Sequence, residues 1–497
     1  MQFILNEQTI ATDEPAGLTV LDFVRYKKNL KGTKIGCREG DCGACTILVG
    51  ELVGERVKYR TMTSCLMPLA NAAGKHIVTI EGINPPDRKL TPVQQAMVDE
   101  SGTQCGFCTV GFVMSLTGFC LDRMCSLSVS SPHVSKGSPS PLESAISSID
   151  GNICRCTGYK SIERAAVRLS TEAESPASAG REVEATRNGF VPDYFTTIAQ
   201  RLSQLAEQSP LSQPLTQSVL PFVAGGTDAY VQRPETMADS ETTPLLYDDR
   251  LRGVREHGEF IEIGASATVT DLLESPVMQS VFPDLYRHLK LVSSTPIRNM
   301  ATLAGNFINA SPIGDMTVWF LALDAEIVLS SPRDKGEVAD ASADGVILSR
   351  ELKLRSLYLG YKQLSKKPDE IVTAVRFRKP TGNFRFNFEK VSKRTYLDIA
   401  TVNTAISMER RHPAGSSDLV FETVHLSAGG VAPIPMYLKE TSAFLRGREI
   451  NEETVTAANE IMQSEIAPIS DVRGSADYKR LLLRQLFRAH FVELFDL

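Results

Sequence analysis

Short stretches of alternating apolar and polar residues surround one helical stretch at the start of the chain. The expected strands are residues 2–5, 8–11, 46–49 and 56–61. The stretch after Thr19 is apolar at helical spacing, and threonine is a typical residue at a helix N-cap. This order of strands and one helix predicts a small α+β domain over residues 1–82.

The apolar spacing becomes helical in the next part of the chain. Thr91 and Pro92 are the residue types expected at the N-cap and the first position of a helix, and residues 111–119 continue at helical spacing. Residues 126–141 are rich in serine and proline, which predicts a surface loop. We therefore expect a helical domain over residues 83–170 that this loop interrupts.

The second half of the chain combines strands and helices. Residues 171–189 are rich in Glu, Ala, Ser and Gly and are expected to form a linker. Strands and helices then alternate over residues 190–382, and residues 383–497 predict a smaller α+β domain that ends in a helix at 478–495. The expected fold class is a multidomain α+β protein.

Composition and charge narrow the functional classes. The chain has 497 residues, of which 42% are hydrophobic and 23% charged, as in ordinary globular domains. Its formal net charge of −6 argues against nucleic-acid binding. The N-terminus shows no secretory signal, and Asp324 and Glu326 interrupt the apolar run at 318–329, so we expect no membrane span and a cytoplasmic protein.

Cysteines give the strongest chemical signal, and all ten lie before residue 157. Cys37, Cys42 and Cys45 have the C-x4-C-x2-C spacing of a plant-type [2Fe-2S] site, and Cys65 supplies a fourth thiol. Thiolates are the soft ligands that iron–sulfur chemistry needs, and glycines next to and between the cysteines allow the backbone to wrap round the metal. These glycines are Gly36, Gly40 and Gly43.

A second group of cysteines follows. Its members are Cys105, Cys108, Cys154 and Cys156. Each pair alone is compatible with zinc or with a redox motif, but after a plant-type loop the four predict a second [2Fe-2S] site. Cys120 and Cys125 lie between the pairs, and either could in principle replace one of the four. Disulfides are disfavoured in a chain without a secretory signal.

Two glycine-containing loops in the second half have the character of nucleotide-binding segments. Residues 222–228 run from an apolar strand into Gly225 and Gly226, where backbone N–H groups can approach phosphates. Residues 294–315 carry short polar side chains that could donate to a diphosphate, and Asp315 could accept from a ribose hydroxyl. These side chains are Thr302, Asn306 and Ser311. Because neither G-x-G-x-x-G nor a Walker A sequence is present, two ordinary glycine turns are the alternative.

Together these motifs resemble the molybdenum hydroxylase family, which includes xanthine dehydrogenases. The resemblance is carried by Cys-Arg-Glu-Gly-Asp-Cys-Gly-Ala-Cys-Thr at 37–46, Gln-Cys-Gly-Phe-Cys-Thr at 104–109 and Cys-Arg-Cys-Thr-Gly-Tyr at 154–159, and by both glycine loops in the same order. It implies a β-grasp ferredoxin-like domain, a helical-bundle [2Fe-2S] domain, an α+β FAD-binding domain and a small C-terminal α+β domain. It also favours eight of the ten cysteines as the cluster ligands, and leaves out Cys120 and Cys125.

The resemblance implies further residues near the cofactors. The FAD contacts that it implies are Gly225, Gly226, Thr227, Asp228, Asn306, Ser311 and Asp315. Asp398 lies in a segment, 390–400, that resembles the family's Arg-Arg-x-x-Asp-Ile-Ala element. Tyr361 and Lys439 correspond to family residues near the flavin ring, although the sequence around them departs from the family pattern. Gln104 corresponds to a residue that faces the pterin, with an ordinary surface glutamine as the alternative.

The function that the resemblance implies is electron transfer in a xanthine dehydrogenase-like complex. Electrons from the hydroxylation of hypoxanthine or xanthine, at a molybdopterin site on a separate large subunit, would pass through two [2Fe-2S] clusters to FAD and then to NAD+. A heterotetramer or larger assembly of heterodimers is expected. The alternatives are the same subunit of a hydroxylase for aldehydes, carbon monoxide or a nitrogen heterocycle, a stand-alone NADH:acceptor reductase, and a zinc-holding storage or assembly protein.

Overall fold

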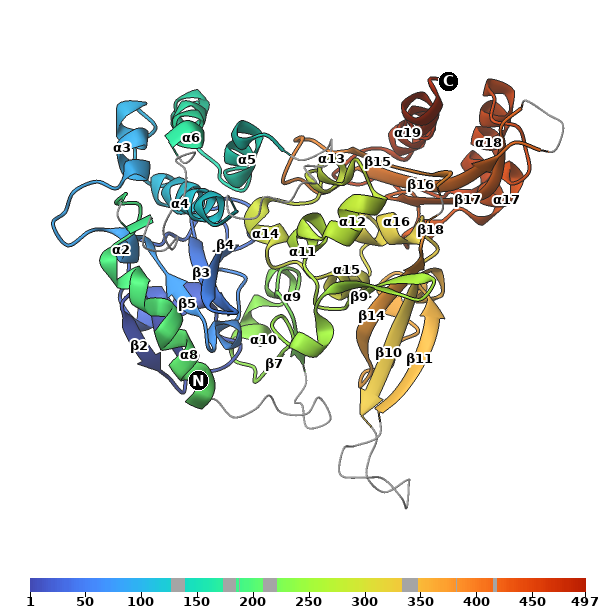
Figure 1. The fold of residues 1–497 in the computed structure, drawn as a ribbon. Helices are drawn as coiled ribbons and strands as arrows, with labels where there is room; N and C mark the ends of the chain where they lie inside the picture. The colour runs from blue at the N-terminus through green and yellow to red at the C-terminus, as the bar shows by residue number, and fades with distance from the viewer. Residues whose placement is uncertain are drawn as a thin grey trace, which may run out of the picture. The chain divides into compact units, whose positions relative to one another are not determined.

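The computed structural model describes most of the chain (Figure 1). The described residues are 1–126, 139–172, 185–186, 188–208, 221–332, 347–380, 382–413 and 418–497. Most of the serine- and proline-rich loop expected at 126–141, and most of the linker expected at 171–189, lies outside these residues. The chain forms two compact units, which are Met1–Asp248 with Ser293–Ala301, and Asp249–Val292 with Thr302–Leu497.

The first unit begins with a five-stranded sheet in the order β2-β1-β5-β3-β4, in which only β1 and β5 are parallel neighbours. The strands are β1 Gln2–Leu5, β2 Gln8–Ala11, β3 Thr46–Val53, β4 Arg56–Thr63 and β5 His76–Val78. Thr19 caps helix α1 (Val20–Asp22) by accepting from the N–H of Asp22, and a π-helical turn, η1 (Phe23–Lys27), continues it. This β-grasp arrangement confirms the fold expected for this part of the sequence.

Four helices of the first unit form a bundle beside the sheet (Figure 1). They are α3 Pro92–Asp99, α4 Thr109–Ser126, α5 Pro141–Ser148 and α6 Lys160–Glu172, and the short α2 (Ile80–Ile83) precedes them. Thr91 and Gln94 form a capping box at the start of α3. Helix α4 packs against β3 and β4 on one side and against the other helices on the other, so Leu48, Phe112 and Ile162 share one core.

The first unit also contains short elements from the second half of the chain. The turn η3 (Asp193–Thr197) and helix α8 (Ile198–Gln208) pack on the β-grasp sheet, where the ring of Phe195 lies 5.4 Å from that of Tyr59. The other short elements are β6 Phe222–Val223, α9 Ala229–Gln232, α10 Pro234–Ala238, β7 Thr243–Pro244, and α14 Thr295–Arg298. Helix α14 packs against β4.

The second unit contains an antiparallel five-stranded sheet in the order β11-β10-β14-β9-β8. Its strands are β8 Val254–His257, β9 Phe260–Gly264, β10 Glu326–Pro332, β11 Ile347–Lys353 and β14 Ile371–Arg378. The helices beside it are α11 Val269–Glu274, α12 Pro276–Val281, α13 Leu285–Leu289, α15 Leu303–Asn309 and α16 Asp315–Leu321. A small hairpin joins β12 (Tyr358–Gly360) to β13 (Gln363–Leu364).

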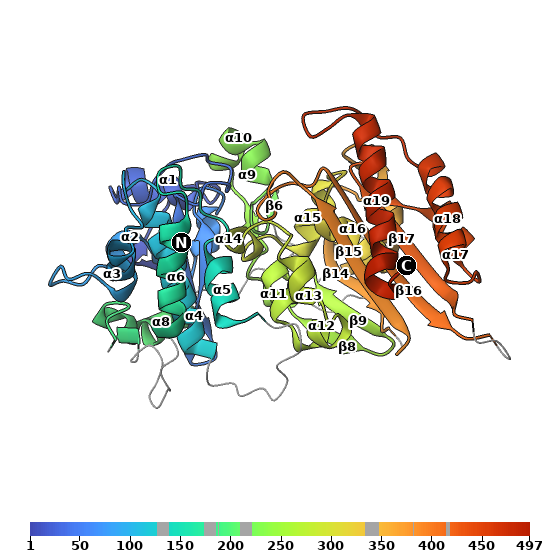
Figure 2. The same cartoon turned by 90° about the horizontal axis from the view of Figure 1, so that it is seen from above.

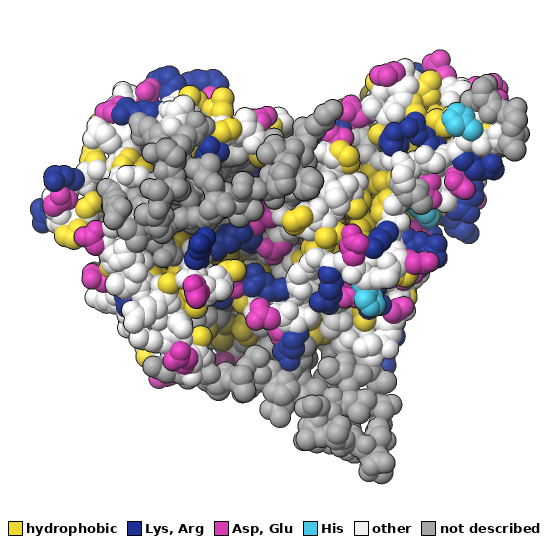
Figure 3. Space-filling model, in the orientation of Figure 1, with side chains coloured by type: hydrophobic (Ala, Val, Ile, Leu, Met, Phe, Trp, Pro, Cys, Tyr) yellow, Lys and Arg dark blue, Asp and Glu magenta, His cyan; other side chains and the backbone are white. Residues whose placement is uncertain are grey.

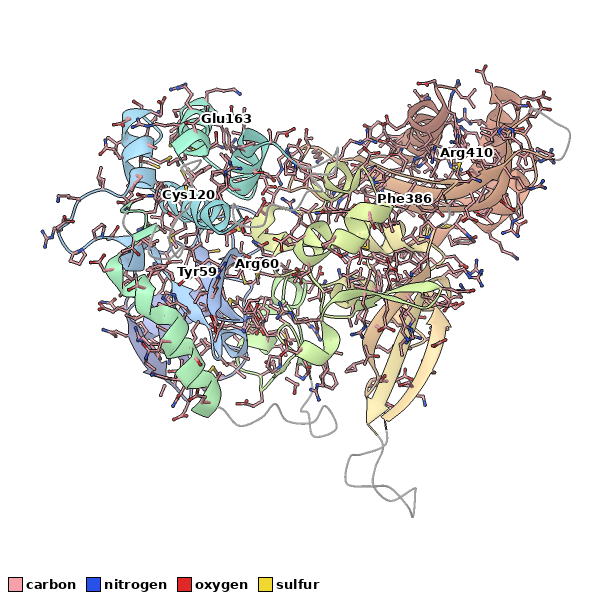
Figure 4. The ribbon with its side chains drawn as sticks, viewed as in Figure 1. Tyr59, Arg60, Cys120, Glu163, Phe386 and Arg410 are labelled. Atoms are coloured by element: carbon pink, nitrogen blue, oxygen red, sulfur yellow. The ribbon has the colours of Figure 1, made fainter. Side chains whose placement is uncertain are left out.

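A second antiparallel sheet completes this unit, in the order β15-β16-β17-β18. Its strands are β15 Phe384–Val391, β16 Val402–Arg411, β17 Val420–Gly429 and β18 Met436–Tyr437. Helices α17 Lys439–Leu445, α18 Glu452–Glu465 and α19 Ala476–Phe495 cover one face (Figure 2). The other face meets α16, where Ser427 donates to the carbonyl of Val318 and Trp319 packs on Phe386 (Figure 4).

Charged side chains of both signs are mixed on one face of the molecule. On the face drawn in Figure 3, Lys and Arg side chains lie among Asp and Glu side chains rather than in one basic patch. Within the described ranges, no helix is both long and apolar enough to cross a membrane.

Candidate cofactor sites

The pairing of β3 with β4 brings two cysteines of the first loop together. Thr46 pairs with Thr63, so Cys45, just before β3, and Cys65, just after β4, lie side by side and are buried. The thiol of Cys65 donates to Cys45. This hydrogen bond lowers the pKa of Cys45 and raises that of Cys65.

The other two cysteines of this loop form a second, half-buried pair. The thiol of Cys42 donates to Cys37, which lowers the pKa of Cys37 to about 5 and raises that of Cys42. The N–H of Glu39 also donates to the Cys37 sulfur, at 3.3 Å. Both hydrogen bonds favour the thiolate, which is the form that binds iron.

The backbone of this loop wraps as its glycines predict, with one exception. Gly40 and Gly43 have positive φ angles of +76° and +67°, which glycine adopts without strain. The third residue with positive φ in the loop is Arg38, at +62°. Gly36 instead allows a close approach, because a Cβ atom there would lie 2.5 Å from the sulfur of Cys42.

The second group of cysteines lies at the ends of helices. Cys105 and Cys156 are exposed with their sulfurs 3.6 Å apart. The N–H of Phe107 and the thiol of Cys156 lower the pKa of Cys105, and donation to Cys105 raises the pKa of Cys156. Cys108 immediately precedes α4, and burial together with donation to Cys154 raises its pKa to about 12.

Cys154 is the fourth cysteine of this group, and its sulfur is paired with that of Cys108. Burial raises its pKa, but hydrogen bonds from the hydroxyl and the N–H of Thr157 outweigh burial, so the pKa is lowered overall. Gly106 and Gly158 have positive φ angles of +80° and +68° and let the two short loops turn tightly.

The eight thiols therefore stand as four pairs. In the part of the chain that the structure describes, no three His, Cys, Asp or Glu side chains converge to hold a single metal ion. A zinc site gathers four ligands round one ion, whereas a [2Fe-2S] cluster divides four thiolates between two irons. Two pairs in each group fit the two-iron cluster.

Cys120 has a different environment. It lies within α4, fully buried in the core of the helical domain and away from the helix ends that carry the second group (Figure 4). The side chain of Cys125 lies outside the described part of the chain.

The two groups of cysteines are joined by direct contacts. The N–H of Ile153, next to Cys154, donates to the carbonyl of Cys42 at 3.0 Å. The side chain of Asn152 donates to the carbonyl of Gly43 at 3.2 Å and accepts from Ser115 at 2.8 Å.

The first glycine loop packs against the first cysteine loop in the same unit. A Cβ atom on Gly225 would clash with the carbonyl of Met300, and one on Gly226 would clash with the carbonyl of Leu66, next to Cys65. Gly226 also has a positive φ of +82°. Thr227 and Asp228 follow, half-buried, at the start of α9. The glycines therefore allow a close approach of protein backbone.

The second glycine-containing loop is divided between the two units. Residues 293–301 belong to the first unit, and the described polar residues from Thr302 onward belong to the second. Thr302 caps α15 by accepting from the N–H of Gly305 at 3.2 Å. Asn306 accepts from the N–H and the hydroxyl of Thr317 in α16, both at 3.0 Å.

The remaining polar residues of this loop lie between α15 and α16. The hydroxyl of Ser311 accepts from the N–H of Ile313 at 3.4 Å. Asp315 begins α16, and its carboxylate accepts from Lys390 at 2.7 Å and from Asn403 at 2.6 Å. Lys390 and Asn403 are therefore residues of this region that the sequence pattern did not single out.

A glycine pair at the end of β17 packs on the same loop. The N–H of Gly430 donates to the carbonyl of Pro312 at 2.9 Å, and a Cβ atom on Gly429 would clash with the side chain of Asn403. The adjacent glycines were the available signal for a close approach.

The other expected site residues are more exposed. Asp398 accepts from the N–H of Arg394 at 3.1 Å; burial raises its pKa, but the Arg394 guanidinium and hydrogen bonds outweigh this and lower it. Tyr361 is 64% exposed in the turn between β12 and β13. Lys439 begins α17 with an exposed side chain, and Gln104 is exposed beside Cys105.

Four family models match successive parts of the chain. They describe a 2Fe-2S iron–sulfur cluster binding domain at residues 3–70, a [2Fe-2S] binding domain at 79–167, an FAD binding domain in molybdopterin dehydrogenase at 196–380 and a CO dehydrogenase flavoprotein C-terminal domain at 388–494. The chain thus carries two [2Fe-2S] domains and an FAD-binding domain.

Curated relatives agree with these domains. The chain is 27% identical to a xanthine dehydrogenase of Emericella nidulans, over 91% of this chain and 35% of that protein, and 26% identical to xanthine dehydrogenase 1 of Arabidopsis thaliana, over 99% and 39%. A carbon monoxide dehydrogenase of Hydrogenophaga pseudoflava that lacks the Mo-pyranopterin moiety of its cofactor matches 55% of this chain and 90% of its own, with 25% identity and a TM-score of 0.47. The chain spans less than two fifths of the two curated relatives.

The domains and their order define an iron–sulfur flavoprotein. The chain belongs to the molybdenum hydroxylase family, and the two curated relatives named above are xanthine dehydrogenases.

Proposed function

We propose that this chain is the electron-transfer part of a xanthine dehydrogenase-like oxidoreductase. Hypoxanthine or xanthine is hydroxylated at a molybdopterin site on a large partner subunit, with oxygen from water, and releases two electrons and two protons. The electrons pass through the two [2Fe-2S] clusters to FAD and then, with one proton, to NAD+. Clusters carry one electron at a time, whereas a flavin can collect two and release them as a hydride.

The arrangement of the thiols is the observation that carries this proposal. The four pairs of cysteines offer two thiolates to each of four irons, and the contact between Ile153 and Cys42 joins the two groups directly. Leu66 joins the first group to the loop of Gly226. This continuous order supports electron transfer from the helical domain to the flavin.

The residues that would hold each cofactor follow from these positions. Cys37, Cys42, Cys45 and Cys65 would hold one cluster, and Cys105, Cys108, Cys154 and Cys156 the other. The FAD-binding segments would be the first glycine loop with Thr227 and Asp228, and the α15–α16 region with Thr302, Asn306, Ser311 and Asp315. Asp398, Tyr361 and Lys439 remain proposed flavin neighbours, and the exposed amine of Lys439 lies 3.9 Å from the carboxylate of Glu440.

The exposed end of the second cysteine group supports docking of the large subunit there. Cys105 and Cys156 are exposed, and so are Gln104 and Phe107 beside them. An exposed aromatic ring next to a redox centre is a typical anchor for a protein interface. A heterotetramer or larger assembly and a cytoplasmic location remain predictions.

An anaerobic absorption spectrum before and after addition of NADH tests the function. We expect iron–sulfur and flavin bands that bleach with NADH. Bands that NADH leaves unchanged would overturn NAD+ as the acceptor, and a colourless, zinc-containing protein would overturn the whole proposal. Co-purification with the large subunit, followed by reduction with xanthine, tests the substrate.

A second candidate is the same subunit of a different molybdenum hydroxylase. The match of residues 388–494 to a CO dehydrogenase flavoprotein domain favours considering carbon monoxide, aldehydes and nitrogen heterocycles as substrates. Reduction of the complex by one of these compounds, and not by xanthine, would select this candidate. A stand-alone NADH:acceptor reductase would instead turn over without any large subunit.

A further inference from the structure

A short segment of the FAD-binding domain is built into the iron–sulfur half of the chain. Ser293–Ala301, called the strap below, lies inside the sequence matched by the FAD-binding family model, yet it belongs to the first compact unit. Its two flanking segments, Asp249–Val292 and the chain from Thr302, belong to the second unit. Residues 196–248, which the same family model matches, also belong to the first unit, so the strap is a later segment of the flavin domain that returns to the unit of the cluster domains.

A buried ion pair fixes the strap to the helical cluster domain. Arg298 lies 2.6 Å from Asp150, and the two side chains are only 4% and 3% exposed. The other carboxylate oxygen of Asp150 accepts from the N–H of Thr295 at 2.7 Å, and the hydroxyl of Thr295 donates to the carbonyl of Ser147 at 2.7 Å. A buried charge pair needs such complete hydrogen bonding to be stable, so its geometry is tightly defined.

The strap also contacts both cysteine loops. A Cβ atom on Gly151, three residues before Cys154, would lie 2.9 Å from Pro296 of the strap. A Cβ atom on Gly40, in the first cysteine loop, would lie 2.7 Å from Ile297. At either position a Cβ atom would force a neighbouring side chain to shift, so the strap lies directly against both loops.

The far end of the strap contacts the first glycine loop. The carbonyl of Met300 fills the space where Gly225 would carry a Cβ atom. Asn299, one residue earlier, donates to the carbonyl of Thr61 on β4 at 2.8 Å and so fixes this end to the sheet. The strap therefore reaches from Asp150 to the loop that is proposed to bind FAD.

We propose that Arg298 and Asp150 are a positioning pair for electron transfer between the clusters and the flavin. They hold the strap, and through Met300 the loop of Gly225, at a fixed distance from the cysteine loops. This inference rests on the proposed function, in which a reduced cluster gives up one electron and the flavin takes it up; two such transfers and protons from water balance the reduction of one flavin. Because tunnelling falls steeply with distance, a small displacement affects the rate more than it affects binding.

The test compares four forms of the full chain loaded with iron–sulfur clusters and FAD. These are the natural sequence, Asp150→Asn, the doubly neutral Asp150→Asn/Arg298→Gln, and the control Glu51→Gln. The control breaks the ion pair of Glu51 with Lys75, at 3.1 Å and 18% and 13% exposed, on β3 of the same unit. Iron and flavin contents and the EPR signals of both clusters establish that each form is loaded.

Two measurements then report on the strap. A laser flash that generates a deazaflavin radical injects one electron, and absorption follows its equilibration between the clusters and the flavin. Hydrogen exchange, with and without cofactors, follows the amides of residues 294–301 and 224–228. We expect both strap variants to retain iron and flavin, to exchange these amides faster, and to equilibrate about tenfold or more slowly, while Glu51→Gln behaves like the natural chain.

Each outcome decides between the proposals. If electrons equilibrate between the clusters and the flavin at the same rate in the strap variants as in the natural chain, the positioning role is overturned. The same holds if this rate falls only as much as it does in Glu51→Gln. If Asp150→Asn fails to fold, the double variant, which leaves no lone buried charge, carries the test, and Thr295→Val serves as a milder one. If the natural chain itself shows no transfer between clusters and flavin, the proposed function fails instead.

Discussion

The backbone N–H of Ile153 donates a hydrogen bond of 3.0 Å to the carbonyl oxygen of Cys42. Cys42 is a proposed ligand of one cluster, and Ile153 is bonded to Cys154, a proposed ligand of the other. A Cβ atom on Gly111, at the start of α4, would clash with the carbonyl of Gly43, so the two domains touch without intervening side chains. The two cluster domains are thus joined by backbone contacts at, or one residue away from, their proposed cluster ligands.

We expect Asn152→Ala to weaken this connection. The variant removes one hydrogen bond to the carbonyl of Gly43, which still accepts from Thr46, and takes from the buried hydroxyl of Ser115 the side chain to which it donates. Together these losses should lower the free energy of unfolding by about 1–3 kcal/mol. It should also reduce the magnetic interaction between the two reduced clusters, measured by EPR. Ser115→Ala is the control, because it leaves the hydrogen bond to Gly43 in place. An unchanged magnetic interaction in Asn152→Ala would contradict the role of this contact.

Replacing single cysteines should separate ligands from core residues. We expect Cys105→Ser to lose the cluster of the helical domain, and Cys37→Ser to lose that of the β-grasp domain, each with half of the iron. Cys120→Ala should keep all of the iron and lose about 1 kcal/mol of stability, because it removes only a buried sulfur from the core of α4. Iron analysis and EPR measure the result. Loss of iron in Cys120→Ala would show that the ligand set is wrong.

Local signals in the sequence were sufficient for the elements around the sites. Thr19 and Thr91 act as helix N-caps because capping depends on residues within one turn. The hairpin of β1 and β2 turns at Asn6, whose φ of +53° suits asparagine. The fold class followed from these local patterns and from the spacing of the cysteines.

Contacts between distant residues were not available from periodicity. Arg298 and Asp150 are 148 residues apart, and no pattern along the chain marks an arginine that will be buried. Thr302 and Asn306 have the short polar side chains of a phosphate-binding loop, yet their oxygens also cap α15 and α16. Residue type alone could not separate these two uses, because both need the same hydrogen-bonding groups.

Lys390→Met should destabilise the second unit strongly. Lys390 and Asp315 are 2.7 Å apart with side chains 1% and 11% exposed, so removal of the lysine leaves a lone buried carboxylate. We expect a loss of about 3–5 kcal/mol in chemical denaturation of the cofactor-free chain, and partial recovery in Lys390→Met/Asp315→Asn. The control, Lys353→Met, breaks ion pairs with Asp324 and Glu326, but this lysine is 37% exposed, so the loss should be about 1 kcal/mol. Equal losses for the two lysines would contradict this interpretation.

His76 should make the stability of the β-grasp domain depend on pH. Its Nε2 donates to the carbonyl of Asn6 at 2.9 Å, and its Nδ1 accepts from the hydroxyl of Tyr59 at 2.8 Å, so the folded chain holds one neutral tautomer. Burial lowers its pKa from 6.5 to about 3. As the pH falls below 6.5, the unfolded chain binds a proton that the folded chain excludes, so this contribution to stability is complete above pH 6.5 and is lost toward pH 3.

The expected slope is about 1.4 kcal/mol per pH unit for one imidazole, and His76→Gln should remove it between pH 6 and pH 4. The variant should also be less stable than the natural chain at pH 7.5, because glutamine cannot reproduce both hydrogen bonds with the same geometry. Thermal unfolding across this pH range measures both effects. His257→Gln, at an exposed position on β8, is the matched control and should leave the slope unchanged. A slope in His76→Gln equal to that of the natural chain would mean that other groups, and not His76, account for the loss of stability in acid.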